Sequence, residues 1–220
     1  MIRAIGWLLH TFSYLLAVGT FIYLIGFSMN RYTFNTVDSG LQLPRWEALL
    51  RDIVLLLLFA VPHSLLARRA VKRFRWHKTV YLFVTAITLI VLFFKWEPIP
   101  NPVWYFRDLW WLDAIGWGGW LLTIYSATVL NHAQTFGWST KPARFQAPGL
   151  YRWVRHPQMI GIALGLWCTR DMTQGHLLFA AVLTAYAWIG VWFEERDLKR
   201  ELGPEYLAWR ERTGALLPRP

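Results

Sequence analysis

The sequence predicts an all-α fold: a polytopic membrane helix bundle with about six membrane segments and a cytoplasmic C-terminal helical tail. Hydrophobic residues make up 55% of the 220 residues and charged residues only 16%, whereas charged residues form about a quarter of an ordinary soluble domain. Several apolar stretches also approach or exceed the roughly 20 residues that a helix needs to cross the hydrocarbon core. Together these observations indicate an integral membrane protein.

The predicted segments follow the apolar stretches in chain order. Five stretches approach or reach the length of a membrane span, at residues 5–27, 46–67, 79–94, 112–130 and 174–193. Residues 157–169 would cover only about 20 Å as a helix, so they predict a short or re-entrant segment. Beyond residue 193 we expect the helix to continue to about Leu202, stop at Gly203-Pro204 and restart toward Arg212, because glycine and proline end helices.

The charge distribution points to a membrane rather than to a nucleic acid. The formal net charge is +10, but most of the 23 Lys and Arg residues fall in the loops that a cytoplasmic N-terminus would place inside. The opposite side receives only Arg31, Arg45, Arg51, Lys95, Arg107 and Arg170. We therefore expect the lipid bilayer and no nucleic acid as a partner. The protein is expected in the bacterial inner membrane, with both termini in the cytoplasm.

Ionisable residues gather at the ends of segments that are predicted to face the cytoplasm. Arg155 and His156 directly precede the short segment, and Glu194 and Glu195 directly follow the last one. If a tight turn near residues 170–175 joins these two segments, both pairs return to the same face of the membrane. Because ionisable groups at membrane depth are costly, such a grouping indicates a functional site.

Three chemistries can be compared for the ionisable residues: a metal site, a haem site and a site for a charged cofactor. A metal site is not predicted, because no two of the histidines have the i, i+4 spacing of helical zinc ligands. A haem would need axial ligands on facing helices, which His63 and His132 would supply. A charged cofactor would pair its cationic groups with carboxylates and its anionic groups with Arg or His.

A family resemblance favours the charged cofactor. Residues 150–157, read Leu-Tyr-Arg-Trp-Val-Arg-His-Pro, are followed by Gly161 and later by Glu194-Glu195. This pattern resembles the signature of the membrane S-adenosylmethionine-dependent methyltransferases, the superfamily of the isoprenylcysteine carboxyl methyltransferases and the phospholipid methyltransferases. Within it the chain is most similar to the bacterial methanethiol S-methyltransferase branch, through residues 23–27, 63–68, 131–132, 150–161, 175–180, 194–198 and 216–218.

The resemblance implies S-adenosylmethionine as the cofactor. Arg155 and His156 would hold its carboxylate, and Glu194 or Glu195 would pair with its ammonium or ribose hydroxyls. Gly161 would leave room for the cofactor. The complete set of implied cofactor-binding residues is Tyr151, Arg155, His156, Pro157, Met159, Gly161, Glu194 and Glu195.

The resemblance also implies an acceptor and a division of the chain. The acceptor is expected to be a small, methanethiol-like thiol, with His63, His132 or Arg152 accepting the thiol proton or favouring the thiolate. Residues 1–220 would form one domain, with residues 1–132 as a four-helix frame and residues 149–220 as a cofactor-binding hairpin and tail.

Several alternatives stay open from the sequence. The acceptor could instead be carried on a lipid, as a prenylcysteine carboxylate or a phospholipid amine. Outside the enzymes, the chain could be a haem-binding membrane protein or a non-catalytic membrane subunit. The oligomeric state is left open as well.

Overall fold

The computed structural model describes residues 2–68, 76–106, 108–129 and 147–219. The chain divides into two compact units. The N-terminal unit consists of Met1–Asp108 and Arg170–Val182, and the C-terminal unit of Leu109–Thr169 and Leu183–Pro220. The sequence had placed residues 1–132 in one frame, whereas the structure groups residues 109–129 with the C-terminal unit.

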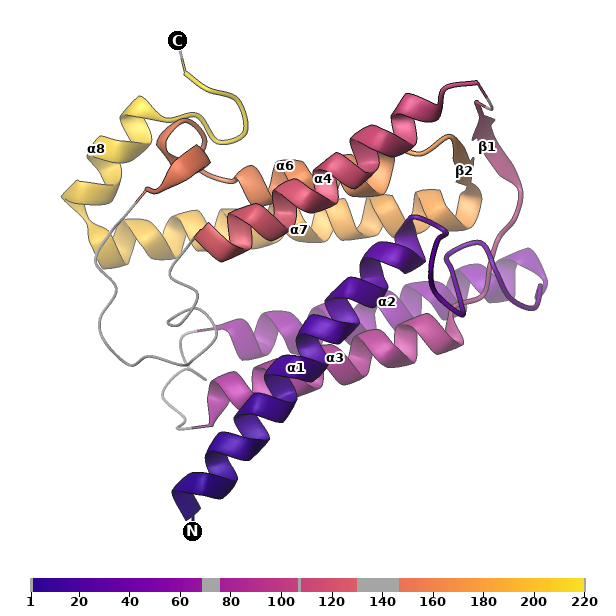
Figure 1. Cartoon of the computed structure of the whole chain (residues 1–220), viewed down its shortest axis with the longest axis horizontal. Coiled ribbons are helices and arrows are strands. Elements are labelled where there is room, and N and C mark those ends of the chain that lie inside the picture. The colour runs from indigo at the N-terminus through magenta and orange to yellow at the C-terminus, as the bar shows by residue number, and fades with distance from the viewer. Residues whose placement is uncertain (1, 69–75, 107, 130–146, 220) are drawn as a thin grey trace. The chain divides into compact units, whose positions relative to one another are not determined.

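Three long helices build the N-terminal unit: α1 (Ile2–Ser28), α2 (Arg45–Ala67) and α3 (His77–Lys95). Both α1 and α2 pack against α3 (Figure 1). The contact faces bury large apolar side chains such as Phe27 and Phe93, whose ring centroids are 5.0 Å apart. The remaining faces keep apolar side chains exposed, for example Leu8, as expected for helices that contact lipid rather than water.

A two-stranded antiparallel sheet joins distant parts of the N-terminal unit. Strand β1 (Pro102–Tyr105) pairs with β2 (Asp171–Thr173), with Trp104 opposite Met172. The chain is mostly helical, as predicted, and this small sheet is an addition to the all-α prediction, which placed only a tight turn near residues 170–175. Such short strands form only where the fold brings them side by side, since an isolated pair is marginally stable.

Two glycine-rich helices cross closely in the C-terminal unit. Helix α4 (Trp110–Val129) packs against the short α6 (Pro157–Trp167). A methyl group added at Gly119 of α4 would lie 2.6 Å from Cβ of Leu164 and 2.7 Å from the carbonyl oxygen of Gly161. The missing side chains therefore permit this crossing, because small residues let two helix backbones approach closely.

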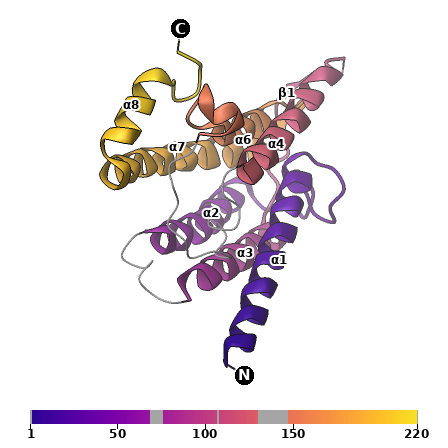
Figure 2. The ribbon, with the colours of Figure 1, turned by 60° about the vertical axis from the view of Figure 1, so that its left-hand side comes forward.

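Helix α7 (Gln174–Leu202) is followed by α8 (Pro204–Arg212). Gly203 separates them with a φ of 53°, a left-handed conformation that glycine adopts readily. Figure 2 shows α8 turning away from the axis of α7. The predicted extension to Leu202 and the restart after the Gly203-Pro204 break are both confirmed.

Four of the described helices are long and apolar enough to cross a membrane: Ala4–Ser28, Arg45–Ala67, His77–Lys95 and Gln174–Leu202. Helix α6 is apolar but has only 11 residues, as predicted for the fifth segment. Helix α4 has 20 residues, but its Trp and Gly residues lower its mean hydropathy, and it is not among these four. The chain is thus a mostly helical integral membrane protein.

Candidate functional site

Arg155 and His156 lie between the 3-10 helix η2 (Gly149–Arg152) and the start of α6. Pro157 begins α6, where its missing N–H costs no helical hydrogen bond. The backbone N–H of Arg155 donates to the carbonyl of Gly214 at 2.9 Å, and that of His156 to Ala215 at 3.1 Å. These bonds hold both buried residues against the chain that follows α8.

Glu195, on the last part of α7, joins three basic side chains. Its Oε1 accepts a hydrogen bond from Nε of Arg155 at 2.7 Å and lies 3.0 Å from Nε2 of His156. Its Oε2 forms an ion pair with Nε of Arg210, at 3.2 Å. The carboxylate is only 14% exposed, and a buried charge of this kind requires such partners.

Helix α8 supplies a further partner from its buried face. Tyr206 has no exposed surface, and its hydroxyl faces the Glu195 carboxylate. Burial, together with the negative charge of Glu195, raises the pKa of Tyr206 well above its ordinary value. The Tyr206 hydroxyl therefore stays protonated and can donate to the carboxylate. We refer to Arg155, His156, Glu194, Glu195, Tyr206 and Arg210 as the charged cluster.

Glu194 differs from its neighbour in exposure. Its side chain is 55% exposed, and its Oε2 lies 3.9 Å from Nδ1 of His156. Tyr151 is buried nearby, and burial together with the charge of Glu194 raises the pKa of Tyr151 to about 12. Glu194 thus adds negative charge next to His156 and Tyr151 on an open side of the cluster.

The remaining cofactor-binding candidates lie on α6. Pro157 is buried at the start of α6, and Met159, two residues further in the same turn, is half-buried. Gly161 lies against α4, where an added methyl group would lie 2.7 Å from the backbone nitrogen of Thr123. In this structure Gly161 allows α6 to pack closely against α4. The family resemblance implied a different role, in which Gly161 leaves room for the cofactor.

The three catalytic candidates fall in different places. Arg152 is exposed at the end of η2, and His132 lies outside the described residues. His63 belongs to the N-terminal unit, where its Nδ1 lies 3.1 Å from Oγ1 of Thr85 and its Nε2 lies 2.9 Å from the hydroxyl of Tyr81. Both ring nitrogens of His63 are engaged, so the structure gives no support to this residue as a haem ligand.

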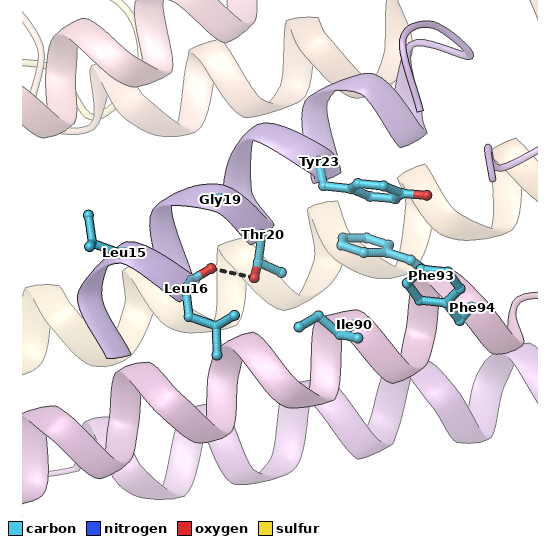
Figure 3. Close-up of a pocket in the computed structure, with 8 residues that line it drawn as sticks. All are labelled: Leu15, Leu16, Gly19, Thr20, Tyr23, Ile90, Phe93 and Phe94. Atoms are coloured by element: carbon cyan, nitrogen blue, oxygen red, sulfur yellow. Dashed lines mark hydrogen bonds between the residues drawn. The ribbon is translucent and has the colours of Figure 1, made fainter. Parts of the chain in front are cut away.

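A pocket in the N-terminal unit lies between α1 and α3 and has a volume of about 260 Å³. Its polar side chains are Thr20 and Tyr23 (Figure 3). The Thr20 hydroxyl donates to the Leu16 carbonyl at 2.6 Å, and the Tyr23 hydroxyl accepts from the Asn35 backbone at 3.0 Å. An apolar groove of this kind offers no charged group to a cofactor, so the charged cluster is the better candidate site.

Sequence reasoning missed the contribution of α8 and the residues after it. No role in a site was predicted for Tyr206, Arg210 or Thr213. The signal was present in the Gly203-Pro204 break followed by Tyr206 and Arg210 four residues apart, a spacing that places both on one helical face.

The fold and the cluster define a membrane protein whose site combines buried basic groups with an open carboxylate. The chain is 37% identical to methanethiol S-methyltransferase 2 of Bradyrhizobium diazoefficiens, over 94% of this chain and 87% of that protein. It is also 37% identical to the methanethiol S-methyltransferase of Mycobacterium tuberculosis, over 94% and 93% of the two chains. Nurim of Sus scrofa is 27% identical over 85% of this chain and 87% of its own.

These similarities place the protein among the membrane methyltransferases. The chain belongs to the methanethiol S-methyltransferase family. No family model matches it, and no solved structure is significantly similar to it. The resemblance predicted from the sequence is confirmed.

Proposed function

We propose that this protein transfers a methyl group from S-adenosylmethionine to the sulfur of a small, methanethiol-like thiol, giving a methyl thioether and S-adenosylhomocysteine. One observation carries the proposal: the 37% identity to methanethiol S-methyltransferases extends over 94% of the chain. The charged cluster lies in the C-terminal unit of this helical membrane protein.

The residues of the cluster fit the proposed cofactor by charge. S-adenosylmethionine carries an ammonium and a sulfonium, which suit a carboxylate, and one carboxylate, which suits basic groups. Glu194 offers an exposed carboxylate, while Arg155 and His156 offer positive charge or hydrogen-bond donors beside it. The proposed cofactor site comprises Tyr151, Arg155, His156, Pro157, Met159, Gly161, Glu194 and Glu195.

When bound, the cofactor supplies an electrophilic methyl group on a positively charged sulfur. The methyl group would pass to the thiolate sulfur, and the electron pair of the broken S–CH3 bond would stay on the sulfur of the cofactor. A cation and an anion thus give two neutral thioethers, a change that is favoured where water is excluded. The protein's part is to exclude water and to remove the thiol proton.

Three residues are proposed for the thiol proton. Arg152 lies in the same unit as the cluster, and its permanent positive charge would favour the thiolate. His63 or His132 would accept the proton as a general base. For His63 this requires exchanging its present bond to Tyr81 or Thr85, which makes Arg152 the first residue to test.

We further propose that residues 1–220 act as one domain with six membrane segments, α4 and α6 being added to the four long helices. The protein would lie in the bacterial inner membrane with both termini in the cytoplasm. Arg196 supports a position of the cluster at the membrane surface, since its guanidinium lies 5.4 Å from the ring centroid of the exposed Trp192. Trp and Arg of this kind are typical of the lipid–water interface.

The test is calorimetric titration of the detergent-purified protein with S-adenosylhomocysteine, followed by methyl-transfer assays on the same preparation. The acceptors are methanethiol, a prenylcysteine analogue and a phosphatidylethanolamine in mixed micelles. We expect binding of S-adenosylhomocysteine and turnover of methanethiol alone. Turnover of a lipid acceptor would reassign the substrate, and an absence of both binding and turnover would reject the proposal.

A further inference from the structure

The two adjacent glutamates of the charged cluster have different surroundings. We infer that Glu194 contacts the cationic end of the bound cofactor, whereas Glu195 is a positioning residue that holds the basic side chains and the C-terminal segment, defined here as residues 204–219. The inference rests on the proposed use of S-adenosylmethionine. The Glu-Glu sequence pattern alone does not say which of the two carboxylates contacts the cofactor.

Glu195 has its hydrogen-bonding capacity committed within the protein. A carboxylate offers about four lone-pair sites, and those of Glu195 face Arg155, His156, Arg210 and Tyr206. Its side chain is 14% exposed. A ligand ammonium could reach this carboxylate only by displacing one of these partners, and an unpaired buried charge would then remain.

The partners of Glu195 are themselves tied to the C-terminal segment. The guanidinium of Arg155 donates through Nη1 to the carbonyls of Thr213 and Arg210, the latter at 3.3 Å. Val154 and Gly214 form a parallel bridge beside it. Glu195 therefore connects α7, the start of α6 and the C-terminal segment, and its removal should loosen all three together.

Glu194 also lies near His156, but its side chain is much more exposed than that of Glu195. It keeps 55% of its side chain exposed while its Oε2 lies 3.9 Å from Nδ1 of His156. Besides burial, the negative charge of Glu194 raises the pKa of Tyr151, which lies on the 3-10 helix η2. A ligand can approach this carboxylate without breaking the network around Glu195, so Glu194 is the carboxylate that suits an incoming ammonium or sulfonium.

The experiment compares two ligands on three variants. S-adenosylhomocysteine carries an ammonium and a carboxylate, whereas 5′-methylthioadenosine keeps the adenosine and the thioether but lacks both charges. Binding of each is measured by calorimetry for wild type, Glu194→Gln and Glu195→Gln. Hydrogen exchange of residues 206–215 is followed in the ligand-free proteins. Glu205→Gln, an exposed glutamate of α8, is the matched control.

For Glu194→Gln we expect a loss of S-adenosylhomocysteine affinity of about 10- to 100-fold, as for a charge-assisted hydrogen bond. Affinity for 5′-methylthioadenosine and hydrogen exchange should stay unchanged. For Glu195→Gln we expect faster exchange of residues 206–215 and weaker binding of both ligands. Glu205→Gln should resemble wild type in every measurement.

Two results would overturn the inference. One is a Glu194→Gln protein that binds S-adenosylhomocysteine as wild type does. The other is a Glu195→Gln protein with unchanged exchange of residues 206–215 that loses S-adenosylhomocysteine alone. Failure of the proposed function looks different, because wild type would then bind neither ligand. In that case the role of Glu194 is rejected with it, while exchange in Glu195→Gln still decides the positioning role of Glu195.

Discussion

Each unit of the protein contains a histidine beside partly buried polar partners, and the two sites differ in the charge of those partners. His63 in the N-terminal unit contacts the hydroxyls of Tyr81 and Thr85. His156 in the C-terminal unit contacts the carboxylate of Glu195 at 3.0 Å. Hydroxyl partners satisfy a neutral imidazole, whereas a carboxylate also stabilises its charged form. The chemical nature of the partner, rather than the degree of burial, therefore distinguishes His63, which links two helices, from His156, which belongs to the charged cluster.

The same contrast holds for two carboxylates. Asp52 in the N-terminal unit is fully buried and accepts a hydrogen bond from the backbone N–H of Glu97 at 3.0 Å. This bond ties α2 to the chain that follows α3. Glu195 instead contacts three basic side chains and a tyrosine. A carboxylate that caps a backbone group supports the fold, while one that gathers basic side chains can also organise a site.

The largest effect is expected from breaking the ionic network at Arg155. Arg155→Met leaves Glu195 with fewer positive partners and deprives the carbonyls of Arg210 and Thr213 of a donor. We expect a loss of about 3 kcal/mol in the free energy of unfolding, as for one partner removed from a buried ion pair. Thermal unfolding followed by tryptophan fluorescence in detergent measures it.

Arg152→Met is the matched control for this change. Arg152 precedes Arg155 by three positions but is exposed, so its replacement should alter the unfolding free energy by no more than about 0.5 kcal/mol. Equal losses in the two variants would show that the buried network adds no special stability to the C-terminal unit.

A smaller effect is expected at the crossing of α4 and α6. Gly119→Ala places a methyl group 2.7 Å from the backbone nitrogen of Gly165, so the helices must separate at a cost of about 1–3 kcal/mol. Gly118→Ala places its methyl group in open space and should be neutral or stabilising by up to about 1 kcal/mol. Chemical denaturation of both variants checks the difference, and destabilisation by Gly118→Ala would contradict this packing.

The smallest effect is expected from the neutral network of the N-terminal unit. Tyr81→Phe removes the hydroxyl that lies 2.9 Å from Nε2 of His63, which should cost about 1 kcal/mol. The exposed Tyr32→Phe serves as the control. Thermal unfolding of the two variants is compared with that of Arg155→Met. If Tyr81→Phe lost as much free energy of unfolding as Arg155→Met, the neutral network of His63 would stabilise the protein as much as the ionic network of His156, contrary to this prediction.

The sequence predicted the long helices to within a few residues. Predicted segments at residues 46–67 and 79–94 correspond to Arg45–Ala67 and His77–Lys95. This succeeds because a membrane helix is specified locally, by an uninterrupted apolar run. The pairing of Trp104 with Met172 was missed, because it depends on residues far apart in the chain and on no local pattern.

The candidate site was predicted in part. Arg155, His156, Glu194 and Glu195 do come together, as expected if α6 and α7 are joined by a short connection. Tyr206 and Arg210 were missed, because their place depends on the direction that α8 takes after Gly203. Their spacing of four residues places both on one face of α8, but the groups that this face contacts depend on the tertiary structure.

The sequence by itself determined that this is a helical membrane protein of the methyltransferase family, because apolar run length and a contiguous motif are properties of the chain alone. Only the tertiary structure decided that Glu195 is enclosed while Glu194 stays open. The two residues are chemically identical neighbours, so no propensity or spacing distinguishes them. Their difference arises from the distinct directions of adjacent side chains on α7 and from the basic groups that the fold brings to one of them.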